Sequence, residues 1–171
     1  MEIVERAVEV NAPLESVFEL LSDFENYPLW MRAVGDVRRT GRGSARWRAE
    51  AADGRPLEWE TETVVFEPDR RIVWRSVGGD VDADGEVVLS ETEYGTTLVR
   101  LVLGYAAPHA SATRLLGRHP ARQLDEDLAR FAHVAERRAR DLQSLLAKQE
   151  AGADFAITQV FFRVEDYLRL R

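Results

Sequence analysis

The sequence predicts an α+β fold: a curved antiparallel sheet of six to seven strands wraps around a long C-terminal helix, and two short helices follow the first strand. Three patterns predict it: apolar residues recur with period two in residues 2–10, with period two again in segments between residues 45 and 103, and with period 3.6 from about residue 121. The segments in the middle are joined by short turns, and short turns connect antiparallel neighbours.

The first elements are predicted from alternation and helix signals. Residues 2–10 alternate valine with charged side chains, which is typical of a half-buried strand. Asn11 is expected to cap the following helix, with Pro13 in its first turn. A second short helix is expected to end before Pro28, because the residue preceding a proline is disfavoured in the α region.

The middle of the chain is predicted to form the sheet and one wall of a cavity. Trp47, Trp59 and Trp74 fall on the low-charge face of their strands. Short side chains share that face: Ala45, Ala49, Thr61, Thr63 and Ser76. Large rings beside short side chains leave volume for a ligand unless other parts of the core fill it. Ordinary core packing is the alternative interpretation.

The opposite face of the sheet and the last helix complete the predicted layers. Glu58, Glu60 and Glu62 alternate as a solvated strand face, whose single-sign charge would discourage pairing with another chain. An apolar stripe marks the last helix: Leu124, Leu128, Phe131, Ala135, Leu142 and Leu145. A helix of more than twenty residues needs a surface, and the inner face of the sheet is long enough to provide it.

Composition excludes several classes of function. The net charge of −7 and pI near 5.1 argue against a nucleic-acid partner, which requires a basic surface. The chain has no cysteine, so thiolate sites are excluded, and His109, His119 and His133 lack the spacing of metal ligands. No cofactor motif and no metal site are predicted. Without a leader or an apolar run of about 18 residues, no integral membrane segment is expected, and the protein is predicted to be cytoplasmic.

Residues 3–146 resemble the START-like and polyketide cyclase/dehydrase superfamily, which has the helix-grip fold. Three stretches carry the resemblance: "VEVNAPLESVFELLSDFENYPLWMRAV", "PDRRIVWRS" and "DEDLARFAHVAE". The resemblance implies a domain over residues 1–147 that binds an apolar or aromatic small molecule of lipid, quinone or polyketide type between the sheet and the long helix. Two alternatives stay open: a polyketide cyclase/dehydrase that catalyses aldol cyclisation and dehydration, and a protein-interaction module without a ligand.

The implied cavity has a set of candidate ligand-binding residues. They are Tyr27, Trp30, Trp47, Trp59, Thr61, Thr63, Trp74, Leu89, Leu101, Tyr105, Leu128 and Phe131. The segment "HASATRLLGRHPAR", which contains glycine and proline and precedes the long helix, is a candidate gate over the cavity mouth.

Catalytic residues are not predicted from the resemblance. Aromatase/cyclases of the superfamily use a cavity arginine and a tyrosine, and the matching positions here hold Thr63 and Val34. The remaining catalytic candidate is Arg6, which falls on the same side of its strand as Val4 and Val8. If it faces inward it needs a carboxylate partner or an anionic ligand. Alternatively the strand lies at a sheet edge and the guanidinium reaches water, which is the arrangement we expect. Arg100 is expected on the outer surface.

The C-terminal stretch has a different resemblance. "AGADFAITQVFFRVEDYLRL" is similar to a strand, loop and helix start of methylenetetrahydrofolate reductase. One such unit lacks the rest of the barrel, so residues 148–171 are interpreted as an appendage and Gln159 is not assigned a folate. Its large apolar side chains are expected to pack against the helix-grip body or across a homodimer interface.

Overall fold

A computed structural model describes residues 2–51, 54–105 and 119–150 of the chain. The chain divides into two compact units, Met1–Arg137 and Arg138–Arg171. The candidate site lies in the first unit, so the account of the fold concentrates on it. The predicted boundary between residues 147 and 148 stays a prediction.

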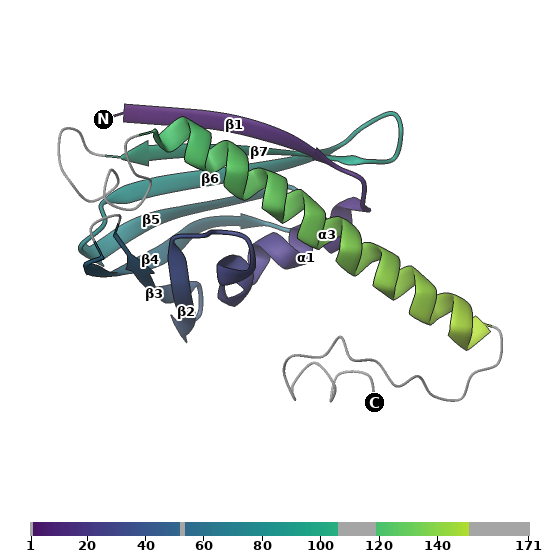
Figure 1. The fold of residues 1–171 in the computed structure, drawn as a ribbon, viewed down its shortest axis with the longest axis horizontal. Coiled ribbons are helices and arrows are strands. Elements are labelled where there is room, and N and C mark those ends of the chain that lie inside the picture. The colour runs from purple at the N-terminus through teal and green to yellow at the C-terminus, as the bar shows by residue number, and fades with distance from the viewer. Residues whose placement is uncertain (1, 52–53, 106–118, 151–171) are drawn as a thin grey trace. The chain divides into compact units, whose positions relative to one another are not determined.

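The first unit contains an antiparallel sheet in the order β1-β7-β6-β5-β4-β3-β2 (Figure 1). The strands are β1 (Glu2–Val10), β2 (Val34–Gly41), β3 (Ser44–Glu50), β4 (Pro56–Glu67), β5 (Arg71–Gly79), β6 (Ala83–Glu91) and β7 (Thr97–Tyr105). β1, the first strand of the chain, pairs with β7, the last. The two edge strands of the sheet are β1 and β2. The curved seven-stranded sheet and the long C-terminal helix confirm the predicted helix-grip fold.

Within the described residues, three helices accompany the sheet: α1 (Leu14–Ser22), the 3₁₀ helix η1 (Phe24–Leu29) and α3 (Pro120–Glu150). The prediction that Asn11 caps α1 is wrong, because Pro13 is the N-cap residue and makes no side-chain capping bond. The backbone N–H of Asn11 donates instead to Glu136 Oε1 of α3 at 3.0 Å. This bond joins the turn after β1 to the helix.

The second short helix does not end before Pro28, as predicted, but includes it. A 3₁₀ helix is short and uses i→i+3 bonds, so a proline removes one bond without breaking a longer ladder. The bonds on either side of the proline are kept: Asn26 N donates to Asp23 O at 2.9 Å, and Trp30 N donates to Tyr27 O at 3.1 Å. η1 therefore contains Tyr27, and Trp30 is its C-cap residue.

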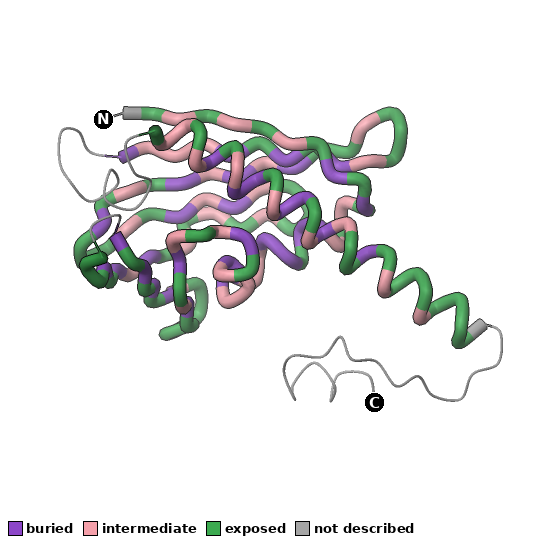
Figure 2. Tube along the Cα trace, viewed as in Figure 1, coloured by how far each residue is buried: buried purple, intermediate pink, exposed green. Residues whose placement is uncertain are grey.

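β2 has no clear counterpart among the predicted strands. Its two buried residues, Val34 and Val37, are three positions apart, and the pairing with β3 shifts between Val34 and Asp36. This irregularity breaks the period of two on which strand prediction depends. The other strands keep the alternation of buried and exposed residues (Figure 2).

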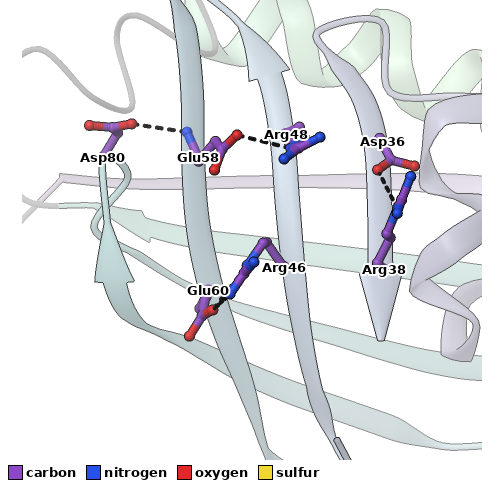
Figure 3. Close-up of polar contacts among 7 residues, drawn as sticks. All are labelled: Asp36, Arg38, Arg46, Arg48, Glu58, Glu60 and Asp80. Atoms are coloured by element: carbon purple, nitrogen blue, oxygen red, sulfur yellow. Dashed lines mark hydrogen bonds and ion pairs between the residues drawn. The ribbon is translucent and has the colours of Figure 1, made fainter. Parts of the chain in front are cut away.

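The outer face of β3 and β4 carries both signs of charge, which corrects the prediction of a single-sign face. Arg46 lies 2.8 Å from Glu60, and Arg48 lies 2.9 Å from Glu58 (Figure 3). Glu62 pairs with Arg75 of β5 at 3.2 Å. β4 lies between β3 and β5, so these glutamates are not on an edge strand and cannot prevent edge pairing with another chain. Exposed pairs of this kind contribute little to stability.

Candidate ligand-binding site

A cavity lies between the sheet and the helices of the first unit. It is lined by Leu21, Tyr27, Trp30, Met31, Trp74, Val87, Val99, Leu101, Leu103 and Leu128. These residues come from α1, from η1 and the two residues Trp30 and Met31 that follow it closely, from the strands β5 to β7, and from α3. The volume is about 20 Å³, which is room for about one water molecule. Apart from the phenol of Tyr27 and the indoles of Trp30 and Trp74, every lining side chain is aliphatic or a thioether.

The Trp74 side of the cavity depends on a glycine. Gly85 of β6 lies opposite Trp74 in the register of β5 and β6. A Cβ atom on Gly85 would lie 2.1 Å from Trp74 Cζ2 and 2.2 Å from Cε2. Only glycine therefore lets the indole lie directly on the β6 backbone.

The volume beside Trp47 is filled by aromatic rings from η1. Phe24 and Tyr27 have ring centroids 5.7 Å and 5.2 Å from that of Trp47. Trp47 also stacks on Trp59 at 5.6 Å, and its Nε1 donates to the buried Thr61 Oγ1 at 2.8 Å. Rings from η1 thus pack on Trp47, and Trp47, Trp59 and Thr61 do not line the cavity.

Tyr27 is the one lining side chain with an ordinary titratable group. The phenol donates a hydrogen bond to the carbonyl oxygen of Leu21 at 3.1 Å. Burial raises the pKa of Tyr27 above its usual value, because the charged phenolate would lose its solvation. The phenol therefore stays protonated across the physiological pH range.

Asp127 of α3 fixes the segment that follows η1. This carboxylate is 1% exposed, and its Oδ1 accepts from Arg32 N at 3.2 Å, from Gln123 Nε2 at 3.1 Å and from the Arg130 guanidinium. Arg130 Nε donates in addition to the carbonyl oxygen of Trp30 at 3.0 Å. The helix thereby holds the backbone on both sides of Met31, a residue that lines the cavity.

Trp30 is buried between two other rings. Its ring centroid lies 4.6 Å from that of Tyr27 and 5.2 Å from that of Phe131, and its side chain is 2% exposed. Among the residues that the structure describes, no group accepts a hydrogen bond from its Nε1. Trp30 therefore carries a buried N–H donor for which the described residues provide no acceptor.

Arg6 faces inward and has the carboxylate partner that an inward-facing arginine needs. It pairs with Leu101 in the β1–β7 register, which puts it on the inner face of an edge strand. Its Nε lies 2.8 Å from Asp125 Oδ1 of α3, and its side chain is 36% exposed. Arg6 thus has a carboxylate partner and partial access to water, and it does not line the cavity. Arg100 points outward and lies 3.2 Å from Glu5, as expected.

The structure brings some of the candidate residues together and places others elsewhere. Five of them line the cavity: Tyr27, Trp30, Trp74, Leu101 and Leu128. Leu89, Tyr105 and Phe131 are buried beyond the cavity wall, and Thr63 is half-buried opposite Trp74. Five lining residues were not among the candidates: Leu21, Met31, Val87, Val99 and Leu103. The alternation through Leu101 would have indicated Val99 and Leu103, whereas no sequence signal marks Met31.

Several remaining predictions concern residues at the surface or outside the described part of the chain. His119 and His133 are exposed, and within the described residues no three histidine, aspartate or glutamate side chains form a group that could hold a metal. His109 and most of the candidate gate fall outside the described residues, as do Gln159 and the rest of the C-terminal stretch. No helix in the described ranges is long and apolar enough to cross a membrane.

Comparisons with known proteins agree with this architecture. The chain is 26% identical over 144 residues to an uncharacterised 17.2 kDa protein of Streptomyces lincolnensis, covering 82% of this chain and 94% of that protein. A START superfamily protein from Mycobacterium smegmatis superposes with a TM-score of 0.61 at 21% identity, covering 82% of this chain and 98% of that chain. The Zhui aromatase/cyclase from Streptomyces sp. R1128 gives 0.62 at 23% identity, covering 80% and 94%.

The family match covers the unit that holds the cavity. The model of the family described as "Polyketide cyclase / dehydrase and lipid transport" matches residues 1–136. The two solved structures show the same fold. With the sheet, the long helix and the cavity between them in place, the chain belongs to the polyketide cyclase/dehydrase and lipid transport family.

Proposed function

We propose that the protein binds an apolar or aromatic small molecule of lipid, quinone or polyketide type between the sheet and α3. The observation that carries the proposal is the composition of the cavity wall, to which six elements contribute aliphatic and aromatic side chains. Such a wall favours a ligand whose apolar surface is removed from water on binding, and it provides no charged group for a polar ligand. The family description supports the same class of ligand.

The size of the cavity sets a condition on binding. A pocket for a drug-sized ligand has a volume of about 300 Å³ or more, whereas this cavity has about 20 Å³. The ligand must therefore push the helices and the sheet apart, or extend the cavity toward an end of the sheet. Because binding then requires a change of conformation, we expect slow association rather than diffusion-limited association.

Native mass spectrometry of the purified protein tests the proposal. We expect an added mass that disappears on denaturation and that organic extraction recovers as an apolar molecule. The variant Val99→Phe fills the cavity and should lose the added mass while keeping the far-ultraviolet circular dichroism of a folded protein. Leu98→Phe, one residue earlier and 40% exposed, is the matched control. If the purified protein carries no added mass and binds no apolar probe, the result would favour the protein-interaction alternative.

The second candidate is a polyketide cyclase/dehydrase, which the family description supports. Aldol cyclisation and dehydration need groups that move protons, and an efficient general base has a pKa near the working pH. In the cavity the titratable candidate is Tyr27, whose pKa burial raises. Arg6 is held by Asp125 at 2.8 Å. If an Arg6→Ala variant keeps full turnover of a polyketide substrate, Arg6 has no catalytic role.

A further inference from the structure

The apolar stripe of α3 continues beyond the residues that are covered. Apolar side chains recur every three or four residues along one face of the helix, and they are buried as far as Ala139, which is 6% exposed. Leu142 and Leu146 continue the same spacing, but they are 47% and 50% exposed. Near its C-terminal end, α3 therefore presents two large apolar side chains that the described residues leave half exposed.

These two leucines differ from apolar residues scattered singly over a surface, which are ordinary in soluble proteins. They lie one helical turn apart, on the face that forms the core of the protein earlier in the helix. Apart from Ala147, the other exposed side chains between residues 140 and 149 are polar or charged. Because burial of leucine is favourable, we expect a partner that removes this face from water.

A second copy of the chain is a poor partner for this face. Two helices form a coiled coil when the apolar seam is sustained over about three to four heptads. The exposed part of the stripe is confined to residues 140–149, which is little more than one heptad, and its large exposed members are Leu142 and Leu146. Such a short seam would not hold two helices together in water.

The segment that follows α3 has the composition of a suitable partner. Residues 151–171 lie outside the described part of the chain, so their sequence is the guide. Gly152 comes two residues after Glu150, and glycine is the residue that most often reverses the chain after a helix. A run of apolar residues follows it: Phe155, Ile157, Val160, Phe161 and Phe162.

The length of the segment is also sufficient. Leu142 lies eight residues before Glu150, which is about 12 Å along the helix axis. An extended chain covers about 3.3 Å per residue, so residues 155–162 can pass both leucines after a reversal at Gly152. The short linker also keeps the effective concentration of the segment in the millimolar range, an advantage that a second copy lacks.

We propose that residues 155–162 fold back and cover Leu142 and Leu146 at the end of α3 in the same chain. The interface is apolar and intramolecular. It is independent of ligand binding, because both of its sides belong to the second compact unit, Arg138–Arg171, whereas the cavity lies in the first.

A spin label in the segment tests the contact in the full chain. The protein has no cysteine, so Gln159→Cys provides one attachment site among the apolar residues. With ¹³C-labelled leucine methyl groups, we expect the label to broaden the signals of Leu142 and Leu146, which recover when the label is reduced. In a mixture of ¹³C-labelled chains without the spin label and unlabelled chains that carry it, the same signals should stay sharp.

Limited proteolysis tests the contact without a label. Chymotrypsin cleaves after aromatic residues, and mass spectrometry identifies cleavage after Phe161 or Phe162. In the double variant Leu142→Gln, Leu146→Gln we expect this cleavage to be at least about tenfold faster, which corresponds to about 1.4 kcal/mol of lost interaction. Glutamine has about the helix propensity of leucine, so α3 itself should stay formed. Leu29→Gln, at a leucine that is 56% exposed, is the matched control and should keep the wild-type rate.

Three results would overturn the inference. The first is no broadening of the Leu142 and Leu146 signals in the labelled chain. The second is broadening only in the mixed sample, which would assign this face to a second copy. The third is a cleavage rate in the double variant that equals that of the wild type. The proposed ligand binding would stand after any of them.

Discussion

Replacing Trp47 by phenylalanine removes the indole N–H that donates to Thr61 Oγ1 at 2.8 Å. Both side chains are buried, at 3% and 1% exposure, so water cannot replace the lost partner. The converse change, Thr61→Val, keeps the shape of the threonine but leaves the indole N–H unpaired. The double variant leaves neither group unsatisfied. The two residues should therefore couple strongly in a double-mutant cycle.

The magnitude follows from the cost of an unsatisfied buried group. Each single variant leaves one such group, which costs about 1 to 3 kcal/mol, and Trp47→Phe loses packing of the larger ring as well. In the double variant only the packing loss remains. We expect a coupling free energy of about 1 to 2 kcal/mol. Trp30→Phe is the matched comparison, because it removes a donor without an acceptor and should destabilise less than Trp47→Phe.

Urea unfolding followed by far-ultraviolet circular dichroism measures the cycle, since this signal does not depend mainly on tryptophan. Single changes that add within about 0.3 kcal/mol would show that the Trp47–Thr61 hydrogen bond does not contribute as described. A loss in Trp30→Phe as large as that in Trp47→Phe would contradict the assignment of an unpaired Trp30 N–H.

Four further predictions concern the network around the cavity and the C-terminal stretch. Asp127→Ala should lower the free energy of unfolding by about 2 to 4 kcal/mol, because it leaves a partly exposed cation and two N–H donors unpaired. Gly85→Ala should cost about 1 to 3 kcal/mol, because its Cβ displaces Trp74. Above pH 10 the wild type should lose about 1.4 kcal/mol of stability per pH unit relative to Tyr27→Phe, since only the unfolded chain ionises Tyr27 there. Deleting residues 152–171 should lower the melting temperature or change the oligomeric state.

Each of these predictions has its own control or contradictory result. Glu60→Ala removes a carboxylate from an exposed pair and should change stability little. Gly78→Ala adds a Cβ with no neighbour within 4 Å. Tyr94→Phe changes a tyrosine that is 80% exposed and should leave the alkaline loss as in the wild type. Controls as damaging as the test variants would contradict the explanations given. A truncated chain with the same melting temperature and oligomeric state would show that the tail does not pack.

Most of the fold could be predicted because burial follows regular periods along the chain. β1 begins and ends at the predicted residues, and the inner face of β7 alternates as expected. β2 was not predicted because its pairing irregularity disrupts the period of two. The end of η1 was predicted wrongly because a 3₁₀ helix tolerates Pro28 where an α-helix does not. The apolar stripe of α3 predicted burial at Leu142, which is 47% exposed. A sequence period states which side chains share a face, but not how far that face is covered.

The candidate site was harder to predict than the fold, because the three predicted tryptophans play different roles. Trp47 packs against rings of η1 and Trp59 stacks on Trp47, whereas Trp74 lines the cavity on top of Gly85. Phe24 lies against both Trp47 and Trp74, so the position of each ring depends on a residue that is distant in sequence from the strands. The unpaired Trp30 N–H likewise depends on where each possible acceptor lies in space, which no local pattern states.

The most direct test of the central claim is where an apolar ligand lies. With ¹³C-labelled methyl groups and an excess of 2-acetylnaphthalene, intermolecular nuclear Overhauser effects identify the methyl groups that contact the probe. We expect contacts to Val87, Leu101 and Leu128, which line the cavity from the sheet and from α3. Contacts only to exposed methyl groups, such as those of Leu29 and Leu98, would contradict binding between the sheet and the helix.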